Sequence, residues 1–203
     1  MNDFVSRGFR GRRRTPDDLA DRVPPGQYVE PRFPVLTAGP TPRVDANEWE
    51  LRIDGMVAEP TTWSAAEFRQ LPFETVPCDI HCVTTWSKLG TSFGGVSLDV
   101  LIDAVEPLGA YAMAHSYGGY TTNVPLADLT DGQAWLVTEH DGAPLPREHG
   151  GPARLLVPHL YFWKSAKWIA GLTIMDHDEP GFWEANGYHM RGDPWREERY
   201  WTD

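Results

Sequence analysis

The residue best placed for chemistry is Cys82, in the segment CDIHCVTTWSKLGTSFGGVS that runs from Cys78 to Ser97. The run ETVPCDIHC alternates well enough to predict a buried strand through Cys78 to Cys82, and the threonines, serines and glycines after it predict a turn-rich loop. A cysteine at such a junction lies at the edge of a cavity, where its thiol could bind a metal or take part in redox chemistry. The alternative is that both cysteines are small buried hydrophobic residues, so the rest of the chain must decide.

Two later segments concentrate polar groups. The segment EHGGPAR has glycines that let the backbone approach a ligand, and it ends in Arg154, a planar cation with five donors. The segment YFWKSAKW contains Lys164, Ser165 and Lys167 among aromatic residues, and it holds two of the three lysines of the chain. Together these groups would suit a ligand with a phosphate and a ring system. Taken singly, each charge could equally be solvated on the surface, and Arg154 could form a surface ion pair of little worth.

Other catalytic and metal-binding patterns are absent from the sequence. Cys78, His81 and Cys82 lack the second CxxC or the His-x3-His partner that a structural zinc site needs. No GxSxG, Walker or GxGxxG motif occurs. Zinc, nucleophilic serine and nucleotide chemistry are therefore not favoured.

Charge and hydropathy restrict the partners. The net charge is −11, although five of the 18 basic residues lie within the first 14 positions. An acidic body argues against nucleic acid as a partner, and no apolar run is long enough to predict a membrane span. Three consecutive arginines at 12 to 14 are followed by acids and prolines instead of an apolar stretch. We therefore expect no export, a cytoplasmic location, and thiols instead of a disulfide.

Many short strands and a few short helices are expected. Ser64 and Glu67 form a capping-box pattern that opens one helix, and apolar residues at 98, 101, 102 and 105 predict a second helix over 97–105. A third is expected over 125–129. Beyond the strand before Cys82, strands are expected over 49–55, 111–116, 120–124, 134–140, 153–158 and 168–176. Because helices and strands do not alternate regularly, the expected fold class is α+β, with mixed sheets and short helices.

The domain organisation follows from composition and length. Residues 1–30 are expected to form an N-terminal arm, draped over the body or disordered, and residues 31–203 a single domain. The proline-rich segment 33–42 is expected to be an ordered extended loop. From Glu179 on, an irregular tail rich in tryptophan, proline and glycine is expected to pack across the surface.

Six segments in order carry a family resemblance: FPVLTAGPTP, WELRIDG, HCVTTWS, YTTNVPL, DGAPLPREHGGPARLLVP and FWKSAKWIAGL. Over roughly residues 30–180 the chain resembles the oxidoreductase molybdopterin-binding domain of sulfite oxidase, assimilatory nitrate reductase and the catalytic subunit of the periplasmic protein-methionine-sulfoxide reductase. The resemblance implies a sulfite-oxidase-like fold with molybdopterin and molybdenum as cofactors. It also places the thiolate ligand of the metal on Cys82, which must be deprotonated when it is bound.

Roles for other residues are implied by the same resemblance. Tyr120 falls on a tyrosine beside the metal and joins Cys82 as a catalytic candidate. Lys167, with the backbone of Ser165 and Ala166, falls on the segment that holds the pterin phosphate. The full set of implied cofactor-binding positions is Leu36, Thr37, Cys82, Ser116, His149, Arg154, Ser165, Ala166 and Lys167.

The departures from the family bear on substrate. Sulfite oxidases carry an Arg-Asn-His run where this chain has Leu36-Thr37-Ala38, and an arginine where it has Ser87. Without these arginines a sulfite dianion would lack its positive partners, so sulfite oxidation is not expected. The chain looks closer to the protein-methionine-sulfoxide reductase branch.

The expected function is a molybdopterin oxidoreductase that transfers an oxygen atom, or performs a related two-electron step, on a small oxidised substrate. Its electrons would come from a separate partner protein. Two alternatives stay open at this point: a molybdopterin-binding module without turnover, and a zinc or redox protein built on Cys78 and Cys82.

Overall fold

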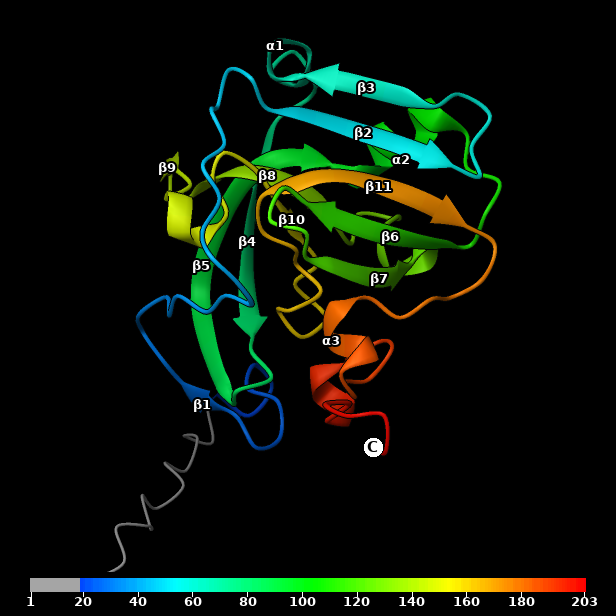
Figure 1. The fold of residues 1–203 in the computed structure, drawn as a ribbon. Helices are drawn as coiled ribbons and strands as arrows, with labels where there is room; N and C mark the ends of the chain where they lie inside the picture. The colour runs from blue at the N-terminus through cyan, green and yellow to red at the C-terminus, as the bar shows by residue number, and fades with distance from the viewer. Residues whose placement is uncertain (1–18) are drawn as a thin grey trace, which may run out of the picture.

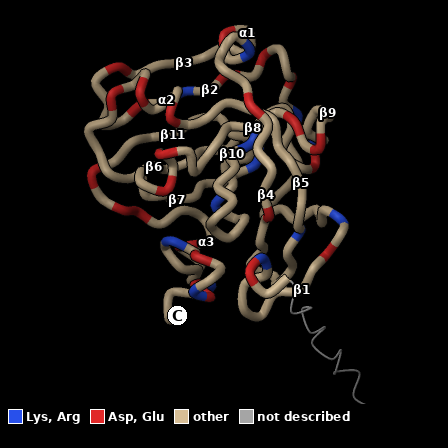
Figure 2. The backbone as a smooth tube through the Cα atoms, turned by 180° about the vertical axis from the view of Figure 1, so that it is seen from behind, with Lys and Arg blue, Asp and Glu red and all other residues tan. Residues whose placement is uncertain are grey.

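The computed structural model describes residues 19–203, and it contains two β-sheets (Figure 1). The arginine-rich start of the chain lies outside the described residues. Within residues 19–203, no helix combines the length and the apolar character needed to cross a membrane. Figure 2 shows acidic positions spread along the loops that join the strands of the five-stranded sheet. A surface of this sign repels polyanions.

The six-stranded sheet carries the segment around Cys82. Its main path runs β1-β5-β8-β10, with β4 paired to β5 and β9 to β8, and only the β1–β5 pairing is parallel. The strands are β1 Tyr28–Val29, β4 Glu74–His81, β5 Trp86–Ser97, β8 Trp135–His140, β9 Ala143–Pro144 and β10 Arg154–Leu156.

The five-stranded sheet has the order β3-β2-β11-β6-β7. Its central pair, β2 and β11, is parallel, whereas its other pairings are antiparallel. The strands are β2 Glu50–Gly55, β3 Thr61–Ser64, β6 Tyr111–Ser116, β7 Thr121–Pro125 and β11 Ile169–Met175. Both sheets are mixed, as the sequence predicted.

The helices are short. Ser64 caps α1 (Ala65–Phe68), and the Glu67 carboxylate accepts a hydrogen bond from the Ser64 amide, so the predicted capping box is confirmed. The helix α2 (Leu98–Val105) buries the predicted apolar stripe at 98, 101, 102 and 105. The remaining helical turns are η2 Leu126–Asp128, η3 Arg147–His149, α3 Phe182–Ala185 and η4 Pro194–Arg196.

One prediction about the central segment was wrong. The expected turn-rich loop after Cys82 is mostly β5, a strand of 12 residues that pairs with β1, β4 and β8. Gly95 lets the backbones of β5 and β8 approach closely, because a Cβ at this position would lie 2.1 Å from the Leu136 carbonyl oxygen. Phe93 and Val96 are buried on this strand. Tertiary packing here overrides the low strand propensity of glycine and serine.

Both ends of the described chain pack against the body. In the part of the expected arm that is described, β1 lies beside β5, and Arg22 forms a bidentate pair with Asp79 at 2.6 and 2.9 Å. The tail after Glu179 is irregular apart from α3 and η4, and Figure 1 shows it below β7. Glu184 in α3 is only 6% exposed.

Two buried clusters position the site. The larger one joins both sheets and α2 through residues such as Leu51, Leu101 and Leu136. The smaller one surrounds Cys82 with side chains from the six-stranded sheet, among them Ile80, Trp86 and Phe93. The sulfur of Cys82 is therefore attached to a well-packed part of the sheet.

Candidate active site

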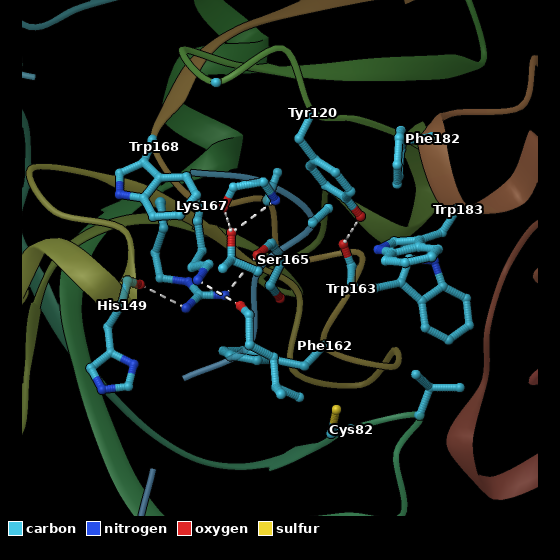
Figure 3. A pocket seen from close by; sticks show the side chains of 18 of the residues that line it. Cys82, Tyr120, His149, Phe162, Trp163, Ser165, Lys167, Trp168, Phe182 and Trp183 are labelled. Atoms are coloured by element: carbon cyan, nitrogen blue, oxygen red, sulfur yellow. Dashed lines mark hydrogen bonds between the residues drawn. The ribbon is translucent and has the colours of Figure 1, made fainter. Parts of the chain in front are cut away.

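A cavity of about 370 Å3 opens where loops from several parts of the chain meet (Figure 3). Its volume is in the range of small-molecule and cofactor sites. Its lining comes from the segments 33–40, 82–86, 118–120, 149–168 and 182–188.

Cys82 lies at this cavity, and Cys78 does not. The Cys82 amide donates to the Trp86 carbonyl oxygen (2.8 Å) and the Thr85 amide donates back to the Cys82 carbonyl oxygen (2.9 Å), which forms a tight turn after β4. In Figure 3 the sulfur of Cys82 points toward the lining side chains, and it lies 3.1 Å from Thr84 Oγ1. Burial raises the pKa of the Cys82 thiol, and the Thr84 contact opposes that rise. Burial raises the pKa of Cys78 to about 12.

Arg154 is the first of two cations at the cavity. It is 2% exposed, and it donates to the carbonyl oxygens of His149 (2.8 Å) and Ser165 (2.6 Å). Its guanidinium also lies 4.1 Å from the centre of the Phe162 ring. Burial lowers its pKa to about 9, so it remains charged at neutral pH.

Lys167 is the second cation. Its Nζ donates to the carbonyl oxygens of Leu36 (2.7 Å) and Glu148 (2.9 Å). Burial and the nearby Arg154 lower its pKa to about 8. Within residues 19–203 neither cation forms an ion pair with a carboxylate. Because a buried charge is costly without a counter-charge, the two cations together suit an anionic ligand.

The remaining polar groups at the cavity are neutral. The His149 ring stacks on Phe33 with centroids 4.0 Å apart, and burial with the neighbouring Arg154 lowers its pKa to about 4. Tyr120 Oη donates to the Trp163 carbonyl oxygen at 2.7 Å. Burial, assisted by the Glu184 carboxylate, raises the Tyr120 pKa well above its ordinary value, so the phenol keeps its proton.

The structure brings together all but one of the candidate residues. Leu36, Thr37, Ser165 and Ala166 line the same cavity as those described above. Ser116 lies at the end of β6, is buried, and is not part of the lining. Its hydroxyl has no hydrogen-bond partner among the described residues.

Lys164 corrects an expectation. Sequence reasoning grouped it with Lys167 near a ligand, or alternatively placed it in solvent. It is instead fully buried, 2.6 Å from Glu184, and does not line the cavity. In this irregular segment a spacing of three residues does not put the two side chains on one face.

Aromatic side chains of the lining were missed. Phe33, Trp163, Phe182, Trp183 and Tyr188 all face the cavity. The tail has no periodicity that would have placed its aromatic residues there; its concentration of tryptophan was the available signal. For the zinc alternative, no group of three or more His, Cys, Asp or Glu side chains within residues 19–203 could hold a metal ion.

A cavity with one thiol, one buried and one partly exposed cation, and aromatic walls suits a cofactor that carries a phosphate and a ring system. Comparison with known proteins identifies the family. Residues 38–183 match the family described as the oxidoreductase molybdopterin binding domain, and the chain belongs to it. It is a molybdopterin-dependent oxidoreductase.

Similar proteins support this assignment. The uncharacterized oxidoreductase YuiH of Bacillus subtilis (strain 168) is 44% identical over 189 residues, which cover 92% of this chain and 96% of YuiH. YedZ1 of Azospira oryzae, provisionally named as a protein-methionine-sulfoxide reductase subunit, is 29% identical over 73% of this chain and 57% of its own length. Sulfite oxidase of Gallus gallus is 26% identical over 81% of this chain and 44% of its own length.

A solved structure supports the fold. The sulfane dehydrogenase SoxCD of Paracoccus pantotrophus aligns with a TM-score of 0.61 and 23% identity, covering 68% of this chain and 40% of that one. The architecture is therefore the expected sulfite-oxidase-like α+β fold.

The residues present fit the cofactor of this family. Lys167 and Arg154 supply positive charge for a phosphate and polar ring atoms, and neither is neutralised by a carboxylate within residues 19–203. The thiol of Cys82 offers a soft ligand of the kind that a molybdenum centre binds, on the wall of the same cavity.

Proposed function

We propose that this oxidoreductase transfers an oxygen atom, or performs a related two-electron step, on a small oxidised substrate, with Cys82 as the thiolate ligand of molybdenum. The observation that carries the proposal is the placement of one thiol and two cations without carboxylate partners on the wall of one cavity. Cys78, on β4, is outside the lining. When it is bound, the molybdenum centre supplies the two-electron redox chemistry.

Lys167 is proposed to hold the cofactor phosphate. The amides of Ser165 and Ala166 already donate to the carbonyl oxygens of Phe162 (3.2 Å) and Lys164 (3.1 Å). The charge of Lys167 is therefore the main contribution of this segment to phosphate binding. Arg154, held by three backbone carbonyl oxygens, presents a fixed cation to the ring system.

Tyr120 is proposed to contact the substrate. Reduction of a sulfoxide or an N-oxide consumes two electrons and two protons and releases one water. The Tyr120 phenol, whose raised pKa makes it a weak acid, is a candidate to orient the substrate at the cavity wall, while the two protons come from solvent. Its hydrogen bond to the Trp163 carbonyl oxygen fixes the direction of the ring.

The substrate is proposed to be neutral, and sulfite oxidation is not favoured. Leu36, Thr37 and Ala38 line the cavity without charge. Ser87 is fully buried and lies 2.9 Å from His81 Nδ1, outside the lining. The provisional name of YedZ1 is consistent with a sulfoxide as the substrate.

The electron source is proposed to be a separate protein, which the name of YedZ1 as a reductase subunit supports. A cytoplasmic location stays a prediction, to be tested by cell fractionation. Both cysteines are free thiols in the structure, which suits a reducing compartment.

The test is metal analysis followed by turnover. The purified protein should contain molybdenum near one atom per chain and release a fluorescent pterin in acid. Reduced methyl viologen should then be oxidised when dimethyl sulfoxide or trimethylamine N-oxide is added. A molybdenum centre that does not cycle with any acceptor would contradict the proposal and favour a cofactor-binding module.

A further inference from the structure

Lys164 and Glu184 form an ion pair in the interior of the protein. Lys164 Nζ lies 2.6 Å from Glu184 Oε1, and neither side chain is exposed. The same ammonium donates to the carbonyl oxygen of Asn123 (2.8 Å) and to that of Met190 (2.5 Å). The pair thus joins the loop after β10, the strand β7 and the C-terminal tail.

Further donors orient the Glu184 carboxylate. Its Oε1 accepts from Trp163 Nε1 and from Thr122 Oγ1, both at 2.8 Å. Its Oε2 has no hydrogen-bond partner among the described residues. Glu184 Oε1 therefore links α3 both to Thr122 in β7 and to Trp163 in the loop after β10.

The residues that this pair holds form one wall of the cavity. Trp163 lines it, and so do Phe182 and Trp183, which precede Glu184 in α3. Figure 3 shows Trp163 and Trp183 close together beyond Tyr120, on the far side of the cavity from His149. Lys164 and Glu184 themselves do not line the cavity.

Stability alone does not explain such a pair. Desolvation of two charges is costly, and apolar residues of similar size often replace a buried ion pair without loss of stability. Its position directly behind Trp163 and α3 suggests that it orients this wall instead. Lys167, which suits the cofactor phosphate, lies on the other side in Figure 3, with its ammonium 4.5 Å from the centre of the Trp168 ring.

We propose that Lys164 and Glu184 are positioning residues that hold Trp163 and α3 as the substrate side of the cavity. The pair thereby sets the affinity for substrate, while cofactor retention depends on Arg154 and Lys167. This inference rests on the proposed function, because it assigns the aromatic wall to the substrate.

The test uses the double variant Lys164→Met with Glu184→Gln, which removes both charges and nearly keeps both volumes. Molybdenum per chain and kcat per molybdenum should stay close to the wild-type values. KM for dimethyl sulfoxide should rise about tenfold, the effect of losing contacts of hydrogen-bond size. Hydrogen exchange over residues 181–190 should become faster. Trp163→Phe, which removes the indole donor to Glu184 together with part of the wall itself, should raise KM in the same direction.

Asp99→Asn is the matched control. Asp99 accepts from the amides of Asp131 and Gly132, both at 2.8 Å, and does not line the cavity. This variant should change neither KM nor exchange over 181–190. An unchanged KM in the double variant, or a loss of molybdenum in parallel with activity, would overturn the positioning role. If the wild-type protein shows no turnover, the proposed function fails. Hydrogen exchange still tests the positioning role in that case, because unchanged exchange over 181–190 in the double variant would overturn it.

Discussion

Single residues in this site differ through their surroundings more than through their type. Cys78 and Cys82 are both largely buried, yet only Cys82 is part of the cavity lining. Lys164 and Lys167 differ in the same way, because one is neutralised by Glu184 and the other has no carboxylate partner within residues 19–203. Chemistry at this site therefore depends on which of two similar residues faces the cavity.

Lys167→Ala should weaken cofactor retention without changing the chemistry. A charge-assisted hydrogen bond contributes about 1.5 to 3 kcal/mol, or one to two decades in affinity. The variant should purify with substoichiometric molybdenum, and each occupied molecule should turn over near the wild-type rate. The measurement is activity divided by bound molybdenum.

Lys88→Ala is the control for this variant. Lys88 is the one lysine of the chain that is neither paired with Glu184 nor at the cavity. Lys164 would be unsuitable because its removal leaves Glu184 buried without its partner. Full occupancy with a reduced rate in Lys167→Ala would place this lysine in the catalytic step and contradict its assignment to phosphate binding.

The candidate residues were predictable from the sequence because cations and a thiol stand out among apolar and aromatic neighbours. Arg154 and Lys167 were found in this way, and family resemblance added Tyr120 and His149. The burial of Lys164 could not be predicted, since its partner Glu184 lies in a tail without periodicity. Contacts distant in sequence, which no local pattern encodes, decide the direction of such a side chain.

At the scale of elements, hydrophobic period predicted β2 and α2, and β6, β8 and β11 were predicted as strand candidates without such a period. In β2 and α2 the apolar residues recur because one face of each packs on the core. The strand β5 was missed because its glycines and serines have low strand propensity. Its conformation is set by β4 and β8 on either side, which lie elsewhere in the sequence.

Gly95→Ala should test the importance of close packing at β5. The new Cβ would lie 2.1 Å from the Leu136 carbonyl oxygen, so β5 or β8 must shift. We expect a loss of about 1 to 3 kcal/mol in the free energy of unfolding, the usual cost of overpacking. Urea denaturation of the purified protein measures it.

Gly118→Ala is the comparison, because its added Cβ would meet only Pro42 atoms at 3.9 Å. This variant should keep the wild-type stability. Equal stability of the two variants would show that β5 and β8 can move apart freely, contrary to the packing described.

At the scale of the whole molecule, the cavity is assembled from segments far apart in the chain. The extended loop 33–40 provides one side and the tail residues Phe182, Trp183 and Tyr188 another. The loop was expected to be ordered from its proline content, but its place in the lining of this cavity follows only from the tertiary fold. Removal of either segment would open the cavity.

The central claim is that Cys82 ligates molybdenum inside this cavity, and X-ray absorption at the molybdenum edge tests it most directly. Wild-type protein and the variants Cys82→Ser and Cys78→Ser would be compared at equal molybdenum content. We predict that Cys82→Ser retains its fold and most of its pterin, loses turnover, and shows one sulfur fewer around the metal, since the phosphate and ring contacts lie elsewhere. Cys78→Ser should match the wild type in turnover and in the number of sulfur atoms around the metal. An unchanged sulfur shell and normal turnover in Cys82→Ser would contradict the account.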